Sequence, residues 1–438
     1  MTYQPKYSSF SGTPTGRATL PIMQLAPSNI LNGNNQVLPH QSSTRNLSIS
    51  AWNLYQAAKK AELASSFNAA QIGHLAYCFA AEHHQMFRWN VGNLRLVDGV
   101  TDWYETAARS RRSGPIGEGM LLLAMHTHGY VFWDRFDVLV KRAIRKQIIK
   151  HPNNVKCVSA VRRLLAKQKC RKRSDFAVET RNGSVALAEA KGSFVTPGNN
   201  PQIARDMRYA LQQLTATAKL VLPQPKKLYA VGTYLREASD PHPDQSLVAM
   251  VDPEPEEDGQ STVELPQDWI RRGNYGAWLV GMGFPESGNA LRHGIGVELP
   301  GRQMLVVEVG RRSFAITIEG VVRKRNRKID DVHPRFWLDP FFFLEGPHFS
   351  DFTVQFLRDM GVAAIRVIGT ELGTLRLIES SVQNSDSTSL LEKDARAGDI
   401  EPQTISDGFT GSIFPDGTLF GQIDLDMLIG ARMEEFRL

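Results

Sequence analysis

The sequence predicts a multi-domain α/β protein. At 438 residues the chain is longer than the usual span of a single hydrophobic core, so more than one domain is expected. Its hydrophobic fraction of 42% and charged fraction of 22% are typical of a folded globular chain. Helical and strand-like patterns alternate between residues 112 and 234, whereas strand-like patterns dominate from about residue 294 onward.

Four regions are expected along the chain. Residues 1–48 are rich in Ser, Thr, Asn, Gln, Gly and Pro without apolar periodicity, which predicts a polar extended or flexible arm. Residues 49–111 begin with apolar side chains at helical spacing and predict a helical N-terminal module. Residues 112–285 form the expected α/β core, and residues 286–438 form a C-terminal α+β domain of unknown role.

The expected core alternates helices and strands. Its elements are, in chain order, a long helix over residues 117–145 kinked near Gly129, a very basic helix over 155–169, strands over 175–180 and 185–191, a helix over 201–220 and a strand over 227–235. Asn200 is the expected N-cap of the helix over 201–220, because Pro201 then takes the first helical position.

One further helix is expected after the acidic stretch, and the C-terminal domain is expected to be rich in strands from about residue 294. The helix covers residues 268–282. The expected strands are residues 303–309, 313–318, 363–368 and 374–378. Pro415-Asp416-Gly417 is a turn signal between apolar neighbours.

Cysteine usage and hydropathy predict a cytoplasmic protein. Cys78, Cys157 and Cys170 are odd in number and widely spaced, which argues against a disulfide framework and favours a reducing compartment. No apolar run approaches the roughly 18 residues needed to cross a bilayer. The first residues carry no basic-then-apolar signal pattern. No membrane association is expected.

Charge is unevenly distributed along the chain. Residues 141–173 contain thirteen Lys or Arg and no acidic residue, whereas residues 237–267 contain nine acidic residues and no Lys or Arg. A basic block of this kind is either a solvated helix face or a surface for phosphate groups. Because the block ends directly before Asp175, we expect it to bind nucleic acid, with Arg171, Lys172 and Arg173 nearest the candidate site.

Glu189 and Lys191 point into one site if their segment is a strand, since residues two apart share a face. Asn182-Gly183 predicts a hairpin that brings this strand next to the one starting at Asp175. A two-residue loop places Asp175 on the opposite face from Glu189, and apolar alternation slightly favours it. A three-residue loop with Gly183 left-handed places Asp175 directly opposite Glu189, and we favour this register.

Asp175, followed fourteen residues later by Glu189-Ala190-Lys191 and Gly192, resembles the signature of the PD-(D/E)XK nuclease superfamily. The resemblance covers residues 112–234 and implies a restriction-endonuclease-like α-β-β-β-α-β core. It also implies that the two acids bind Mg²⁺ and that the lysine assists the attacking water. Glu118 resembles a further acid on the first core helix of many members, and Gln213 a glutamine on the helix after the lysine.

Two features depart from the family pattern. Ser174 stands where the family often has proline, and a first core strand between Glu118 and Asp175 is not evident in so basic a segment. The second departure affects the strand count more than the site.

The resemblance implies a Mg²⁺-dependent nuclease acting on DNA, with Mn²⁺ as a substitute. Asp175, Glu189 and Glu118 are the expected metal ligands, with the Ala190 carbonyl as an additional one, and Lys191 positions water. By analogy such a protein serves bacterial defence against phages or mobile elements, with the C-terminal domain binding a partner or a second copy. The alternatives are a catalytically inactive module for nucleic-acid binding or assembly, and an interbacterial nuclease toxin.

Overall fold

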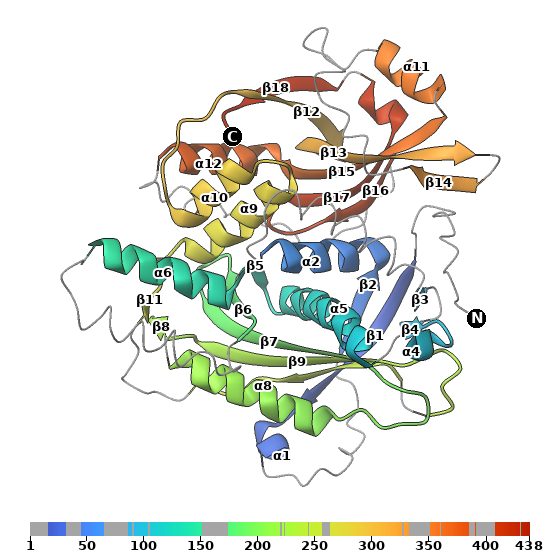
Figure 1. Ribbon diagram of the computed structural model, residues 1–438, viewed down its shortest axis with the longest axis vertical. Helices are drawn as coiled ribbons and strands as arrows, with labels where there is room; N and C mark the ends of the chain where they lie inside the picture. Colours follow the sequence, from blue (N-terminus) through green and yellow to red (C-terminus); the bar gives the residue numbers. More distant parts are fainter. Residues whose placement is uncertain are drawn as a thin grey trace.

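The described residues form a mixed α/β protein with two large, separate β-sheets (Figure 1). The computed structural model describes residues 16–31, 45–64, 86–89, 92–103, 106–150, 174–219, 221–222, 224–243, 245–255, 263–325, 328–332, 351–359, 361–384, 390, 408–429 and 431–438. No helix within these ranges is long and apolar enough to cross a membrane.

The first sheet has seven strands in the order β2-β1-β10-β9-β7-β6-β5. The strands are β1 (Arg17–Leu25), β2 (Arg45–Ser50), β5 (Tyr130–Arg135), β6 (Phe176–Thr180), β7 (Val185–Phe194), β9 (Lys227–Leu235) and β10 (Leu247–Val251). β7 runs parallel to β9 and β1 runs parallel to β10, whereas the other neighbouring pairs are antiparallel.

Helices cover both faces of this sheet. α5 (Thr106–Thr127) packs on one face against β7, and α8 (Ile203–Ala218) packs on the other face against β7 and β9 (Figure 1). α2 (Ala51–Leu63) packs on α5 and separates it from the second sheet. The strands next to α5 and α8 are buried on both faces, which explains their nearly continuous apolar sequences.

The expected single helix over residues 117–145 is wrong. α5 begins at Thr106 and ends at Thr127, Gly129 turns the chain with φ +84°, and β5 follows before α6 (Phe136–Lys150). The four consecutive residues Tyr130-Val131-Phe132-Trp133 are all buried. Such a short apolar run does not distinguish a helix from a strand by its own pattern, and here it is a strand paired with β6 and covered on both sides. β5 is the core strand that the sequence left unplaced, and it lies before the basic block over residues 141–173.

The expected polar arm over residues 1–48 is wrong for its described parts. β1 and β2 are antiparallel neighbours, and β1 pairs with β10, a strand that lies inside the acidic stretch. Ala18, Leu20 and Ile22 are buried at alternate positions of β1. This period of two is the strand signal, and the polar composition around it concealed it. The first sheet therefore extends across the expected arm and the expected core.

The second sheet is antiparallel and comes from the C-terminal region. Its order is β16-β17-β15-β13-β12-β18, with β14 paired to β13. The strands are β12 (Arg302–Val309), β13 (Arg312–Arg325), β14 (Lys328–Val332), β15 (Val362–Glu371), β16 (Phe409–Ile413), β17 (Thr418–Asp424) and β18 (Arg432–Phe436). Between the two sheets lie α2 and the helices α9 (Trp269–Gly281) and α10 (Pro285–His293) (Figure 1).

One expected C-terminal strand is a helix. Residues 374–378 belong to α12 (Leu372–Gln383), where Leu375, Ile378 and Val382 are buried at spacings of three and four. The turn at Pro415-Asp416-Gly417 is confirmed: Gly417 has φ +83° and its N–H donates to the Phe414 carbonyl over 2.9 Å.

The helix and strand predictions around the candidate site agree with β6, β7, α8 and β9. The expected Asn200 N-cap is wrong, because α8 begins at Ile203 and its N-cap is Gln202, without a side-chain cap. The helix expected over residues 155–169, and Arg171, Lys172 and Arg173, lie outside the described residues.

Candidate active site at the β6–β7 hairpin

The hairpin has the three-residue loop that brings the two acids together. Phe176 pairs with Ala188 and Glu179 pairs with Val185, so Asp175 lies opposite Glu189. The Gly183 N–H donates to the Thr180 carbonyl, and the Thr180 N–H donates to the Ser184 carbonyl, each over 3.0 Å. Gly183 has φ +82°. This left-handed glycine after a tight turn shifts the register by one residue relative to a two-residue loop.

Each of the two acids accepts a hydrogen bond from a backbone N–H of the other strand. The Asp175 N–H donates to Glu189 Oε2, and the Ala190 N–H donates to Asp175 Oδ2, each over 2.9 Å. Lys191 Nζ donates to the other Glu189 oxygen, Oε1, and over 2.8 Å to Gln213 Oε1 on α8. The two acids, the lysine and the glutamine therefore lie at one place, as the sequence predicted.

Ser174 fixes the start of the strand that carries Asp175. Its N–H donates to Thr217 Oγ1 on α8 over 3.0 Å, and its hydroxyl donates to the Ala188 carbonyl over 3.1 Å. Thr217 in turn donates to the Gln213 carbonyl. A proline at position 174 lacks the N–H that bonds to Thr217. In this chain hydrogen bonds, rather than a rigid ring, hold the backbone before Asp175.

Glycines set the distance between α5 and the site. A Cβ at Gly117 would lie 2.8 Å from Gly192 Cα, and a Cβ at Gly192 would lie 2.0 Å from the Ser113 carbonyl oxygen. Only glycine at both positions allows this approach of the helix to the strand. Glu118 follows Gly117 directly, so the contact places Glu118 near the strand residue that follows Lys191.

Glu118 is paired with Arg135, at the end of β5. Arg135 Nη2 lies 2.7 Å from Glu118 Oε2. Burial raises the pKa of Glu118 to about 7, with the Arg135 guanidinium opposing the rise and the Asp175 carboxylate adding to it. Glu62 on α2 is electrostatically coupled to Glu118 and has its own pKa raised to about 7, first by burial and then by Glu118.

Glu189 also has a raised pKa. Burial and then the negative charge of Asp175 raise the pKa of Glu189 to about 8, although Lys191 and the Asp175 N–H oppose the rise. Its side chain is only 1% exposed, whereas that of Lys191 is 27% exposed. A buried acid forced against a second acid is a frequent feature of functional sites.

The acids fit a divalent cation with an incomplete protein ligand set. Among the described residues no three Asp, Glu, His or Cys side chains are grouped as a metal-binding cluster. Mg²⁺ retains several water ligands and is commonly held by one or two carboxylates. Asp175 and Glu189, opposite each other with mutual repulsion, provide this smaller set. A cation between them would remove the repulsion that raises the pKa of Glu189.

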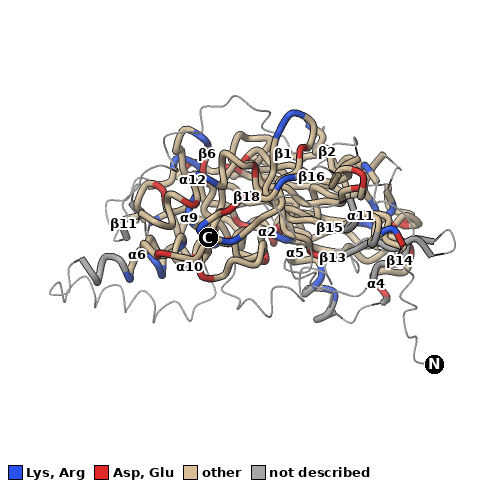
Figure 2. The backbone as a smooth tube through the Cα atoms, turned by 90° about the horizontal axis from the view of Figure 1, so that it is seen from above, with Lys and Arg blue, Asp and Glu red and all other residues tan. Residues whose placement is uncertain are grey.

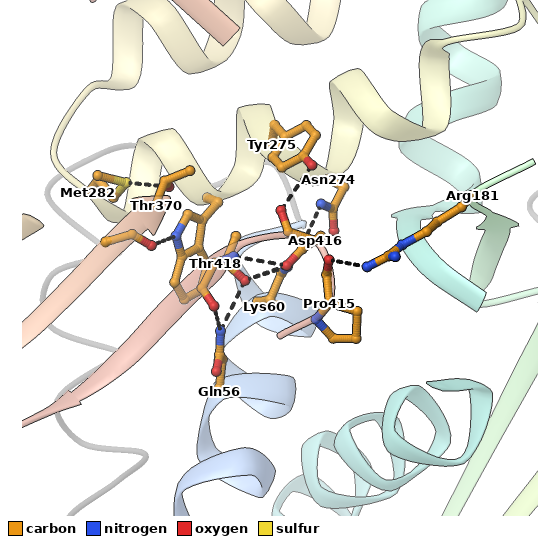
Figure 3. Close-up of polar contacts among 12 residues, drawn as sticks. Gln56, Lys60, Arg181, Asn274, Tyr275, Met282, Thr370, Pro415, Asp416 and Thr418 are labelled. Atoms are coloured by element: carbon orange, nitrogen blue, oxygen red, sulfur yellow. Dashed lines mark hydrogen bonds and ion pairs between the residues drawn. The ribbon is translucent and has the colours of Figure 1, made fainter. Parts of the chain in front are cut away.

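The hairpin tip is held by α9 and by the C-terminal region. Arg181 donates to the Pro415 carbonyl over 2.9 Å (Figure 3). The buried Arg271 on α9 donates through Nε to Glu179 over 2.8 Å and through Nη2 to the Arg181 carbonyl. The β16–β17 turn is therefore in direct contact with the hairpin that carries the two acids.

The described part of the basic block is only partly available to a ligand. Basic segments lie along α6 (Figure 2). Lys141 pairs with Asp137 at 3.0 Å, and the buried Arg142 pairs with Asp134. The described basic side chains of α6 are thus in part structural. The expected phosphate contacts of Arg171, Lys172 and Arg173 stay a prediction, because these residues lie outside the described part.

Several site residues were missed by sequence reasoning. Arg135 and Glu62 lie far from the motif in sequence, and Arg135 stood in a segment interpreted as helix. Ser174 was noted only as a departure, and Thr217 was not noted. Asp206, whose pKa is raised by burial and lowered in part by Lys191, lies seven residues before Gln213 on α8. This helical spacing was the one signal that could have indicated it.

Comparison with models of protein families, with curated proteins and with solved structures gave no match to this chain.

Proposed function

We propose that this protein is a Mg²⁺-dependent nuclease with a restriction-endonuclease-like core, and that its substrate is DNA. One observation carries the proposal: Asp175 lies opposite Glu189 on the neighbouring strand, with Lys191 bound to Glu189 from the same face. Two acids can hold a metal ion that activates water and phosphate, and an amine beside them can offset the charge that develops on the phosphate.

The order of elements around the site supports the proposal. The chain passes in order through α5, β5, α6, β6, β7, α8, the short β8 (Val221–Leu222) and β9. β5, β6 and β7 are antiparallel neighbours in the sheet, and β9 joins β7 in parallel after the α8 crossover. Apart from α6, which stands between β5 and β6, and β8, this order corresponds to the α-β-β-β-α-β core that the motif implies, with β5 as the first strand.

Each residue of the site has a role in the proposed reaction. Asp175 and Glu189 would hold Mg²⁺, with the Ala190 carbonyl as a further ligand and Glu118 nearby; the ion supplies Lewis-acid activation of water and phosphate. Lys191 orients the attacking water and offsets negative charge that develops on the phosphate. Gln213 fixes the direction of the Lys191 ammonium through its 2.8 Å hydrogen bond.

An inactive nucleic-acid-binding module is the second candidate. The observation in its favour is that Lys191 and Arg135 already neutralise Glu189 and Glu118. A role in bacterial defence against phages or mobile elements is proposed by analogy with the superfamily.

Cleavage assays test the proposal. Purified protein is incubated with circular, linear and single-stranded DNA in Mg²⁺ or EDTA, and we expect cleavage only with Mg²⁺. Lys191→Ala should lose cleavage while it retains DNA binding. Arg88→Ala, which removes an exposed 3.3 Å ion pair with Asp98, is the control and should cleave normally. Equal cleavage by Lys191→Ala and the wild type contradicts the nuclease assignment.

A further inference from the structure

Arg135 lies next to the strand that begins beside Asp175 and also contacts Glu118 on α5. It pairs in register with Phe176, the residue that follows Asp175, and the Phe136 N–H donates to the Asp175 carbonyl over 3.0 Å. Its guanidinium lies over the Phe176 ring at 5.0 Å and pairs with Glu118 at 2.7 Å. Arg135 is thus the second basic side chain of the site. It contacts Glu118 on α5, whereas Lys191 contacts Gln213 on α8.

The guanidinium retains capacity for a further ligand. Its side chain is 21% exposed, and the ion pair with Glu118 uses only Nη2. Arginine has five N–H donors in a planar fork that matches the oxygens of a phosphate. Stacking on Phe176 limits its orientations, which lowers the entropy lost when a phosphate binds.

Two of the three acids of the site already have a basic partner: Lys191 pairs with Glu189, and Arg135 pairs with Glu118. A cation held by the acids adds positive charge next to both basic side chains and weakens their attraction to the carboxylates. The basic groups are then available to a phosphodiester that enters the same place.

We propose that Arg135 binds the phosphate of the nucleic-acid substrate, and that Glu118 holds Arg135 until Glu118 exchanges it for a divalent cation. The inference rests on the proposed nuclease function, since it assigns the substrate-binding group of the same site. It predicts opposite effects of Arg135 on the two ligands: the guanidinium opposes cation binding and favours DNA binding.

Two binding measurements without cleavage test the exchange. Mn²⁺ affinity is measured by electron paramagnetic resonance without DNA, and affinity for a DNA duplex is measured by fluorescence anisotropy in Ca²⁺. For Arg135→Gln we expect Mn²⁺ to bind about tenfold more tightly and the duplex about tenfold more weakly, from removal of one nearby charge. Arg135→Lys should restore part of the DNA affinity. Weaker Mn²⁺ binding, or unchanged DNA affinity, would show that Arg135 is only a brace for Glu118.

Arg312→Gln is the matched control. Arg312 pairs with Glu371 at 2.7 Å and lies 5.2 Å from the centre of the Phe314 ring, so its surroundings resemble those of Arg135. It belongs to the second sheet and should affect neither ligand. If Arg312→Gln changes both affinities as much as Arg135→Gln does, Arg135 has no specific role in the exchange.

Glu118→Gln gives an independent test if Arg135→Gln does not fold. In EDTA, Glu118→Gln no longer holds Arg135 in an ion pair. We therefore expect the duplex to bind this variant several-fold more tightly than it binds the wild type. A duplex affinity of Glu118→Gln that equals or falls below that of the wild type refutes the exchange. If both exchange tests succeed but the wild type does not cleave DNA, the nuclease proposal fails and the binding role of Arg135 stands.

Discussion

Two buried lysine–carboxylate pairs in this molecule are opposite in their electrostatics. In the candidate site Lys191 pairs with Glu189, and between the sheets Lys60 pairs with Asp416; both carboxylates are at most 1% exposed. The pKa of Glu189 is raised to about 8, whereas the pKa of Asp416 is lowered. Burial alone raises both pKa values, so the neighbours of each acid determine the difference.

Asp416 is surrounded by donors. It accepts hydrogen bonds from Lys60, from Asn274 over 2.8 Å and from the Thr418 hydroxyl over 2.7 Å (Figure 3). Lys60 also lies over the rings of Trp133 and Trp278. These residues around Asp416 form a junction between α2, α9 and the β16–β17 turn. In this junction the Asp416 carboxylate and the Lys60 ammonium neutralise each other. In the candidate site Glu189 instead faces the Asp175 carboxylate. The repulsion between them is unfavourable for the ligand-free fold, and such a cost is common at sites that bind a ligand.

The largest expected effect is on stability at the junction. Asp416→Ala leaves the Lys60 ammonium buried without its partner, and we expect a loss of about 3–5 kcal/mol. The melting temperature in scanning calorimetry measures it. Asp426→Ala, at an exposed partner of Arg358, should change the stability by less than about 1 kcal/mol. A loss of similar size in both variants contradicts the interpretation of the junction as a stabilising cluster.

Glu189→Gln is expected to have the opposite effect on stability. Unfolded Glu ionises near 4.5, whereas folded Glu189 keeps its proton up to about pH 8, so this group makes the metal-free protein less stable as pH rises from 4.5 to 8. The loss above pH 8 is on the order of a few kcal/mol. In EDTA at pH 8, Glu189→Gln should therefore melt higher than the wild type, with a smaller difference near pH 5. The variant should not cleave DNA. A lower melting temperature at pH 8 contradicts the repulsion between Glu189 and Asp175.

Sequence reasoning predicted the parts of the site that depend on local geometry. The spacing of Glu189 and Lys191 places both on one face, and Asn182-Gly183 predicts a hairpin whose register the sequence restricts to two alternatives within one short segment. Arg135 was not predicted, because a short apolar run does not distinguish a strand from a helix by its own pattern. The hydrogen bond from Ser174 to Thr217 joins residues 43 positions apart, so no local pattern indicates it.

The fold was predicted to a similar extent. Strands next to α8 were found because a helix and its flanking strands alternate within the core. β1 was missed because polar residues surround its alternating pattern, and no local pattern indicates its pairing with β10, more than two hundred residues away in sequence. Residues 374–377 of α12 alternate polar and apolar side chains as a strand does, whereas the burial of Leu375, Ile378 and Val382 follows helical spacing.

Thr217→Val tests the support of Asp175 and should have a moderate effect. The variant leaves the buried Ser174 N–H without its acceptor, which costs about 1–3 kcal/mol. We also expect several-fold weaker Mn²⁺ binding, because the backbone before Asp175 is less restrained. Thr215→Val on the same helix is the control. If metal affinity is unchanged while stability falls, Ser174 and Thr217 stabilise the fold without positioning the acid.

Arg181→Ala should have the smallest effect, and it tests whether the junction and the site are coupled. The substitution removes the 2.9 Å hydrogen bond to the Pro415 carbonyl, but Arg271 still holds the hairpin at Glu179 and at the Arg181 carbonyl. A single hydrogen bond of this kind contributes about 0.5–1.5 kcal/mol, so a small fall in melting temperature is expected. Mn²⁺ affinity should stay within about twofold of the wild type, because the acids lie at the other end of the hairpin. A larger loss of affinity would mean that the C-terminal region controls the geometry of the acids through Arg181, and that the two clusters act as one unit.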